Sequence, residues 1–308
     1  MHRLALTAAL LMSVVIDGGL TVEAIPEVLL TEKVKVLGLD DLDRLGVEAQ
    51  EATDSGLYQK ALETLELILS IERKELGPEH ADVGGTLRWQ GMIYLYQESY
   101  DKAQPLLLQA LKITEKALGQ EHPDTGDILI DLALAYKGQG LYSKAEPLLL
   151  RALDITKNTL GAEHQVTGER INHLASLYAK QGKYDKAEPL YLRALDITKK
   201  ILGGEHPGTA TIMNSLGLLY ADQRLYEKAE TLYVTALSIR EKTLGSNHPL
   251  TAVSLNNLGL LYEGKGLYKQ AEPLFLRALD IAEEQLGNDT KMTIAILTNL
   301  AGVYETEG

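Results

Sequence analysis

The sequence predicts an all-α protein, an α-solenoid of stacked helix pairs, and two periodic features carry that prediction. A Leu-Gly dipeptide and a tyrosine each recur six times at intervals of 42 residues. No copy carries an insertion or deletion, so each is expected to occupy the same place between its neighbours. The dipeptides are Leu76-Gly77, Leu118-Gly119, Leu160-Gly161, Leu202-Gly203, Leu244-Gly245 and Leu286-Gly287, and the tyrosines are Tyr58, Tyr100, Tyr142, Tyr184, Tyr226 and Tyr268.

Within one copy, residues 207–245, apolar and small residues follow helical spacing twice. The first run precedes the short turn at Arg224-Leu225, and the second run follows it. Each copy is therefore predicted to be two helices of about four turns, each with one apolar face. The first run contains Leu216, Gly217 and Tyr220, and the second contains Tyr226, Ala229, Tyr233, Ala236 and Leu237.

This order of residues resembles the tetratricopeptide repeat. The copy that carries it most fully has Leu258, Gly259, Tyr262, Ala271, Phe275 and Ala278. The 42-residue length and the phrase from Leu255 to Tyr262 resemble the repeats of kinesin light chains and their bacterial relatives. The resemblance covers roughly residues 40–305 and implies a right-handed superhelix of tetratricopeptide helix pairs.

The domain boundaries follow from the period. Residues 40–308 are predicted to form six helix pairs plus one unpaired helix, and residues 25–39 a lead-in segment. The first copy departs from the pattern at Glu48 and Ala52, as an end cap would.

The N-terminus has two readings. Residues 1–24 resemble a secretory signal peptide, because a short apolar run follows Arg3 and small residues flank Glu23. The protein would then be periplasmic or secreted. The alternative is a buried or interfacial helix in a cytoplasmic protein, and the run is too short to span a bilayer.

The charge and the cysteine count exclude several functions. A formal net charge of −13 opposes binding to nucleic acid, and Lys and Arg form no basic block. The absence of cysteine excludes disulfides, thiolate metal sites and cysteine nucleophiles.

Five histidines lie on the period and could suggest a metal site. Equivalent atoms in stacked repeats are about 10 Å apart, which is too far for two ligands of one ion. Three of the histidines precede proline, which favours the first helical position, so they are predicted to cap helices. The five are His80, His122, His164, His206 and His248.

No residues stand out as catalytic or as ligands of a cofactor or metal. The stretch from Gly259 to Lys265 matches part of a phosphate-binding loop, but Gly266 replaces the Ser or Thr that would bind magnesium. The protein is therefore predicted not to be an enzyme and to need no cofactor.

The resemblance also implies where a partner would lie. In tetratricopeptide arrays the first helices line a concave groove, and family members often bind peptides there. The predicted groove positions are the residue two before the central leucine of each first helix, and the residues that helical spacing places on the same side of that helix. Three asparagines in it could pair with an extended backbone, or could instead be solvated or bond the neighbouring repeat. The predicted peptide-binding residues are Arg88, Asn172, Lys180, Asn214, Asn256 and Thr298.

Three functions follow from these features. The first is a protein-interaction scaffold that binds a peptide segment of a partner protein in the groove. The second is a sensor or regulatory arm of a larger effector, and the third is a rod that self-associates through the C-terminal helix at Leu297, Leu300 and Tyr304.

Overall fold

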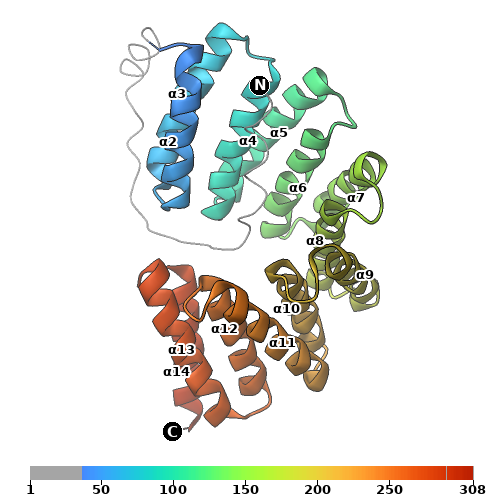
Figure 1. Ribbon diagram of the computed structural model, residues 1–308, viewed down its shortest axis with the longest axis vertical. Helices are drawn as coiled ribbons and strands as arrows, with labels where there is room; N and C mark the ends of the chain where they lie inside the picture. The colour runs from blue at the N-terminus through green and yellow to red at the C-terminus, as the bar shows by residue number, and fades with distance from the viewer. Residues whose placement is uncertain (1–36, 289, 308) are drawn as a thin grey trace. The chain divides into compact units, whose positions relative to one another are not determined.

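The computed structural model describes residues 37–288 and 290–307, and its helices follow the 42-residue period (Figure 1). The predicted signal peptide at 1–24 and most of the lead-in lie outside the described residues. The described part contains a short 3₁₀ helix, Leu39–Asp41, and 13 α-helices. These are α2 (Leu42–Asp54), α3 (Tyr58–Glu75), α4 (Ala81–Tyr96), α5 (Tyr100–Leu118), α6 (Pro123–Gly138), α7 (Tyr142–Leu160), α8 (Gln165–Lys180), α9 (Tyr184–Leu202), α10 (Pro207–Asp222), α11 (Tyr226–Leu244), α12 (Pro249–Gly264), α13 (Tyr268–Leu286) and α14 (Lys291–Glu307).

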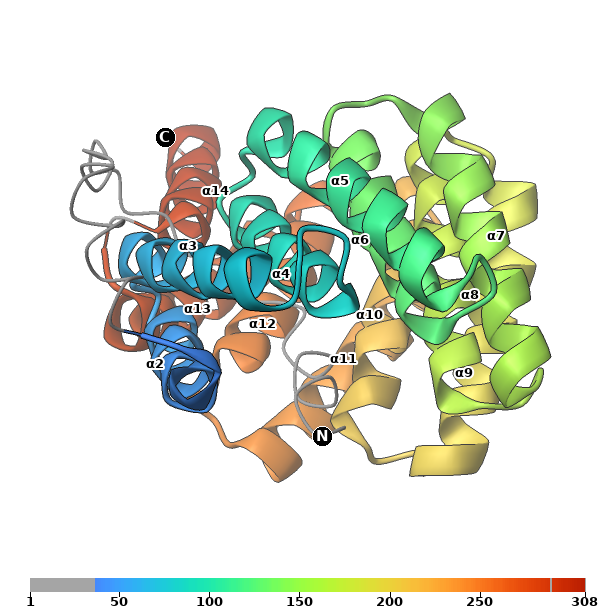
Figure 2. The same cartoon turned by 90° about the horizontal axis from the view of Figure 1, so that it is seen from above.

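The helices are arranged as successive pairs, which confirms the all-α prediction. The even-numbered helices from α4 are the first helices of their repeats, and each odd-numbered one is a second helix. The most extensive contacts join α4 to α5, α6 to α7, α10 to α11 and α12 to α13. Figure 2 shows α4, α5 and α6 side by side. The last helix, α14, packs on α13.

Small residues let the two helices of a pair approach closely. In the pair α10–α11, a Cβ atom added at Gly217 would lie 2.7 Å from the ring of Tyr233, which is fully buried. Gly259 and Phe275 repeat this arrangement in α12 and α13. Glycine is therefore required where the ring packs against the helix backbone.

Backbone conformation explains why Leu-Gly recurs. The glycine that ends each second helix from α5 onward has φ between 93° and 104°. A side chain there would be strained, so glycine ends each of these helices.

Histidine caps the first helices, as predicted. The imidazole Nδ1 of His206 accepts a hydrogen bond from the backbone N–H of Gly208 at 3.0 Å. The hydroxyl of Thr209 donates to the carbonyl of Gly203 at 2.8 Å, so the threonine holds the preceding turn. The same histidine bond occurs at His80, His122, His164 and His248.

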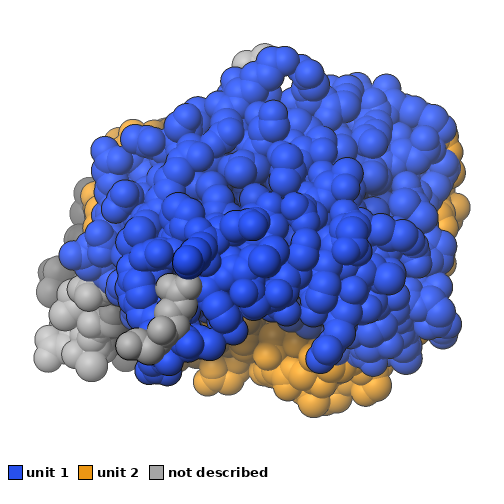
Figure 3. Space-filling view, turned by 90° about the horizontal axis from the view of Figure 1, so that it is seen from below, with its two compact units in different colours: residues 1–18, 178–308 blue, residues 19–177 orange. Residues whose placement is uncertain are grey.

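The described chain divides into two compact units (Figure 3). We call residues 37–177 the N-terminal unit and residues 178–307 the C-terminal unit. The boundary falls within α8, and each unit has its own buried apolar clusters.

Candidate functional site

We call the predicted groove positions of the first helices, together with the residues one turn later, the first-helix face. It is divided between the two units. Arg88 and Asn172 lie in the N-terminal unit, and Asn214, Asn256 and Thr298 in the C-terminal unit.

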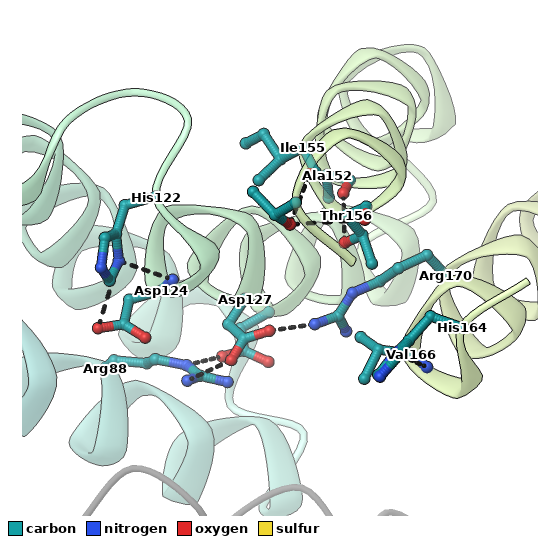
Figure 4. A network of polar contacts seen from close by, with 12 residues as sticks. Arg88, His122, Asp124, Asp127, Ala152, Ile155, Thr156, His164, Val166 and Arg170 are labelled. Atoms are coloured by element: carbon teal, nitrogen blue, oxygen red, sulfur yellow. Dashed lines mark hydrogen bonds and ion pairs between the residues drawn. The ribbon is translucent and has the colours of Figure 1, made fainter. Parts of the chain in front are cut away.

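In the N-terminal unit, Arg88 belongs to a network of charges that joins three first helices (Figure 4). Its Nε donates to Oδ2 of Asp131 at 2.6 Å, and its Nη1 donates to Oδ2 of Asp127 at 3.3 Å. Arg170 of α8 donates to the other oxygen of Asp127. The two carboxylates thus hold α4, α6 and α8 together through two guanidinium groups.

Burial and pairing act in opposite directions on these groups. Burial works against the charge of Arg88, but Asp131 and Asp127 outweigh it and raise the pKa of the guanidinium. Burial also raises the pKa of Asp131, and Arg88 opposes that shift. The charge of Arg88 is therefore already neutralised by two carboxylates of the same chain, and its main role is to hold first helices together.

Around Asn172 the polar groups are less completely paired. The Oδ1 atom of Asn172 is buried and has no hydrogen-bond partner within the described residues. One turn later, Ser176 accepts a hydrogen bond from Nζ of Lys137 at 3.2 Å. Next to Asn172, burial lowers the pKa of His173 to about 3, helped by the charges of Lys137 and Arg170.

In the C-terminal unit, two predicted groove asparagines bond the next repeat. Nδ2 of Asn214 donates to Oγ of Ser254 at 3.0 Å, and Oδ1 of Asn256 accepts from Asn299 at 2.9 Å. Asn214 is only 6% exposed. Its amide nitrogen therefore connects α10 to α12, which is the alternative that the sequence left open.

The remaining predicted residues lie at the surface. Lys180 is exposed at the end of α8. Thr298 is exposed on α14, and its hydroxyl donates to the carbonyl of Ile294 in its own helix. In the described part of the chain, neither side chain forms a hydrogen bond or ion pair with another helix.

Sequence reasoning missed two exposed leucines on the first-helix face. Leu218 and Leu260 each lie four residues after a groove asparagine, on the same face of α10 and α12. Their exposed fractions are 45% and 40%. The 42-residue spacing between them was the signal, but leucine in a helix is ordinarily assigned to the core.

Other kinds of site find little support in the described part of the chain. No three His, Asp or Glu side chains there lie close enough to hold a metal ion. No described helix is long and apolar enough to cross a membrane. A shallow hollow of about 400 Å³ lies at the turn between α11 and α12, where His248, Pro249 and Gln285 line it.

Comparison with known proteins identifies the family. The tetratricopeptide repeat family matches residues 82–158, 169–233 and 215–284. The chain belongs to the tetratricopeptide repeat family. No curated protein sequence matches it.

Solved structures show which tetratricopeptide repeats this chain resembles. A putative kinesin light chain of Podospora anserina with nearly identical repeats is 28% identical, with a TM-score of 0.54, over 67% of this chain and 99% of that one. BtubC (BKLC) from P. vanneervenii is 22% identical, with a TM-score of 0.56, over 80% and 92%. The repeats of this chain are thus of the kinesin light chain-like kind.

A third tetratricopeptide structure shows the same fold inside a larger protein. It is a signal transduction ATPase of Pyrococcus horikoshii with a tetratricopeptide repeat sensor. The two are 20% identical, with a TM-score of 0.59, over 86% of this chain and 39% of that one. Tetratricopeptide repeats generally mediate contacts between proteins and generally serve as scaffolds without catalytic activity.

Proposed function

We propose that the protein is an interaction scaffold that binds an extended segment of a partner protein along the first-helix face. The observation that carries this proposal is the exposure of Leu218 and Leu260 at the same position of consecutive repeats. Exposed apolar side chains in a regular row favour contact with another protein. The spacing of the row along two parallel first helices suits a partner that runs across them.

The polar groups of the face support the same proposal. Asn256 is partly exposed beside Leu260, and its amide nitrogen is not used in the bond with Asn299. It remains available to pair with a carbonyl group of an extended backbone. Lys180 and Thr298 belong to this proposed surface in the C-terminal unit, and Asn172 belongs to the corresponding face of the N-terminal unit. Arg88 and Asn214 act mainly by holding first helices together.

A double substitution, Leu218→Ser with Leu260→Ser, tests the proposal. The matched control is Val234→Ser with Leu276→Ser on the second helices of the same repeats, where the exposed fractions are 47% and 40%. Partners are captured from the native source on immobilised protein and quantified by mass spectrometry. We expect the first pair to reduce capture of specific partners and the control to leave it unchanged.

The control also makes the test decisive. Loss of capture in the second-helix variant alone would assign binding to the opposite surface. Equal capture by both variants would reject an apolar contact on the first-helix face. Circular dichroism checks that both variants keep their helices, which exposed positions should allow.

A second candidate function, self-association through α14, is favoured by a specific apolar surface. Ile294, Leu297 and Tyr304 are exposed on this helix. The sequence also placed Leu300 in this contact, but that was wrong, because Leu300 is 7% exposed and packs in the cluster around Phe275. Light scattering tests self-association: a mass that doubles with concentration in wild type but not in Leu297→Ser supports it, and a constant monomer mass rejects it.

A further inference from the structure

Arg240 of α11 is a buried cation without a carboxylate. It is 2% exposed and lies between the first helices α10 and α12. Nη1 donates to the carbonyl of Leu250 at 2.8 Å and to Oγ of Ser254 at 2.9 Å, and Nη2 donates to Oγ1 of Thr211 at 3.1 Å. All three acceptors are neutral. Burial of an uncompensated charge is costly, so this arrangement needs an explanation.

The hydrogen bonds of this guanidinium group are incomplete. A guanidinium has five N–H donors, and three bonds are made here. The buried Nε atom has no partner within the described residues. An anion with two oxygens could therefore still bind to Arg240.

The surroundings add further positive potential. The guanidinium contacts the second turn of α10, at Thr211, and the first two turns of α12, at Leu250 and Ser254, so the positive ends of both helix dipoles are nearby. Neither helix has an acidic residue in its first turn, whereas α6 has Asp124. Burial alone lowers the pKa of Arg240 to about 10, and burial together with Arg240 lowers the pKa of His248.

The N-terminal unit shows how a cation at another repeat position, Arg170, is neutralised between first helices. Arg170 occupies the repeat position of Ser254, and Asp127 occupies that of Thr211, since each pair is 84 residues apart. Arg170 binds the carboxylate of Asp127, which is partly exposed on α6 (Figure 4). Arg240 meets only the hydroxyl of Thr211 at the same repeat position. Arg170 thus has a carboxylate partner at this repeat position, whereas Arg240 has a hydroxyl there.

We propose that a carboxylate group of the bound partner segment docks on α10 at Thr211 and neutralises Arg240. This inference rests on the proposed function, since it assigns one chemical feature to the segment that crosses the first-helix face. Thr211 is partly exposed, and its Oγ1 atom accepts from Nη2 of Arg240 and donates to the carbonyl of Pro207 at 3.2 Å. Rotation of this side chain would release both bonds and leave Nη2 free to donate to an incoming carboxylate. The carboxylate belongs to an Asp or Glu side chain or to a chain terminus.

Three blocked peptides and acetate test this inference on the full chain. Acetyl-Leu-Asp-Leu-amide carries an acidic side chain, acetyl-Leu-Asn-Leu-amide carries no charge, and acetyl-Leu-Asn-Leu ends in a free carboxylate. Binding is followed by NMR at the Arg240 Nε–H signal and at the methyl groups of Leu218 and Leu260. Sodium acetate is compared with sodium chloride at equal ionic strength. The two charged peptides should bind about tenfold or more tightly than the neutral one.

Two substitutions and one control make the assignment specific. Arg240→Thr installs the residue found at this repeat position in Thr114, Thr156 and Thr198, so the variant should fold. It should bind all three peptides equally. Thr211→Asp supplies a carboxylate from within the chain and should reduce the advantage of the charged peptides about tenfold. Ala295→Asp adds the same charge at this repeat position on the exposed side of α14, away from Arg240, and should leave a clear advantage.

The outcomes separate this inference from the proposed function. Equal binding of the three peptides to wild type, with no acetate shift at Arg240, overturns the inference and leaves the first-helix face in place. An acetate shift at Arg240 without any peptide effect on the leucine methyl groups supports the anion site and counts against the proposed function. If no probe shifts either the Arg240 signal or the leucine methyl signals, both the inference and the proposed function are overturned.

Discussion

Nε of Arg88 in α4 donates to Oδ2 of Asp131 in α6 at 2.6 Å, so a buried ion pair joins the first helices of two consecutive repeats. Asp131 is almost fully buried, and Asp127 supports the pair from one turn away. Contacts of this kind hold a repeat array together, since each repeat is stabilised mainly by its neighbours. The pair therefore belongs to the interface between repeats.

Replacement of Asp131 by Ala should destabilise the N-terminal unit by about 3 kcal/mol or more, because it leaves a buried guanidinium without its main partner. The free energy of unfolding is measured by urea titration. The control Glu205→Gln breaks an exposed pair with Lys242 and should cost less than about 1 kcal/mol. The double variant Arg88→Met with Asp131→Leu should recover most of the loss, and a failure to recover it would assign the loss to packing.

Gly217→Ala should destabilise the C-terminal unit by about 1–3 kcal/mol, since the new methyl group would lie 2.7 Å from the buried ring of Tyr233. Gly264→Ala is the control. It lies at the end of the next first helix with no atom within 4 Å of the added Cβ, and should be neutral or stabilising by up to about 1 kcal/mol. Thermal unfolding followed by circular dichroism compares the two. A similar change in both would reject close packing as the reason for glycine at 217.

The 42-residue period predicted the helix pairs and their caps because both depend on local chemistry. Second helices begin at the periodic tyrosines, and first helices follow the periodic histidines. The glycine of Leu-Gly recurs because it readily adopts the positive φ found where these helices end. The histidine recurs because its side chain accepts a hydrogen bond from a free backbone N–H group at the helix start. Such signals lie within a few residues of the structure that they specify.

The candidate site was predicted less well because its contacts join residues about 40 positions apart. Asn214 pairs with Ser254 and Asn256 with Asn299, so two of the three predicted groove asparagines connect neighbouring repeats. A signal was nevertheless present at the repeat position of Arg170, where three other copies carry isoleucine. Arg170 interrupts this row of isoleucines and pairs with Asp127. Arg240 interrupts a row of threonines at another repeat position and pairs with no carboxylate among the described residues.

His173→Gln should make stability less sensitive to acid. Burial lowers the pKa of His173 to about 3, so between pH 6.5 and 3 only the unfolded chain gains the proton. Stability supplied by the neutral imidazole is therefore present above pH 6.5 and is lost as the pH falls, by about 1.4 kcal/mol per pH unit. Urea titrations at pH 7, 6 and 5 should show a steeper decline for wild type than for the variant. Parallel declines would mean that His173 is protonated in the folded protein.

Glu72→Gln should stabilise the N-terminal unit at neutral and alkaline pH. Burial raises the pKa of Glu72 to about 7, and the hydrogen bond from Thr86 only partly offsets this, while Oε2 has no partner within the described residues. The folded chain holds the proton up to pH 7, whereas the unfolded chain releases it near pH 4.5. Stability from Glu72 is thus complete below pH 4.5 and is lost as the pH rises to 7, by up to about 3 kcal/mol. The variant should exceed wild type by that amount above pH 8 and match it near pH 4 in urea titrations. Glu75→Gln, on the exposed end of the same helix, should show no such dependence, and an equal gain there would attribute the effect to net charge instead of burial.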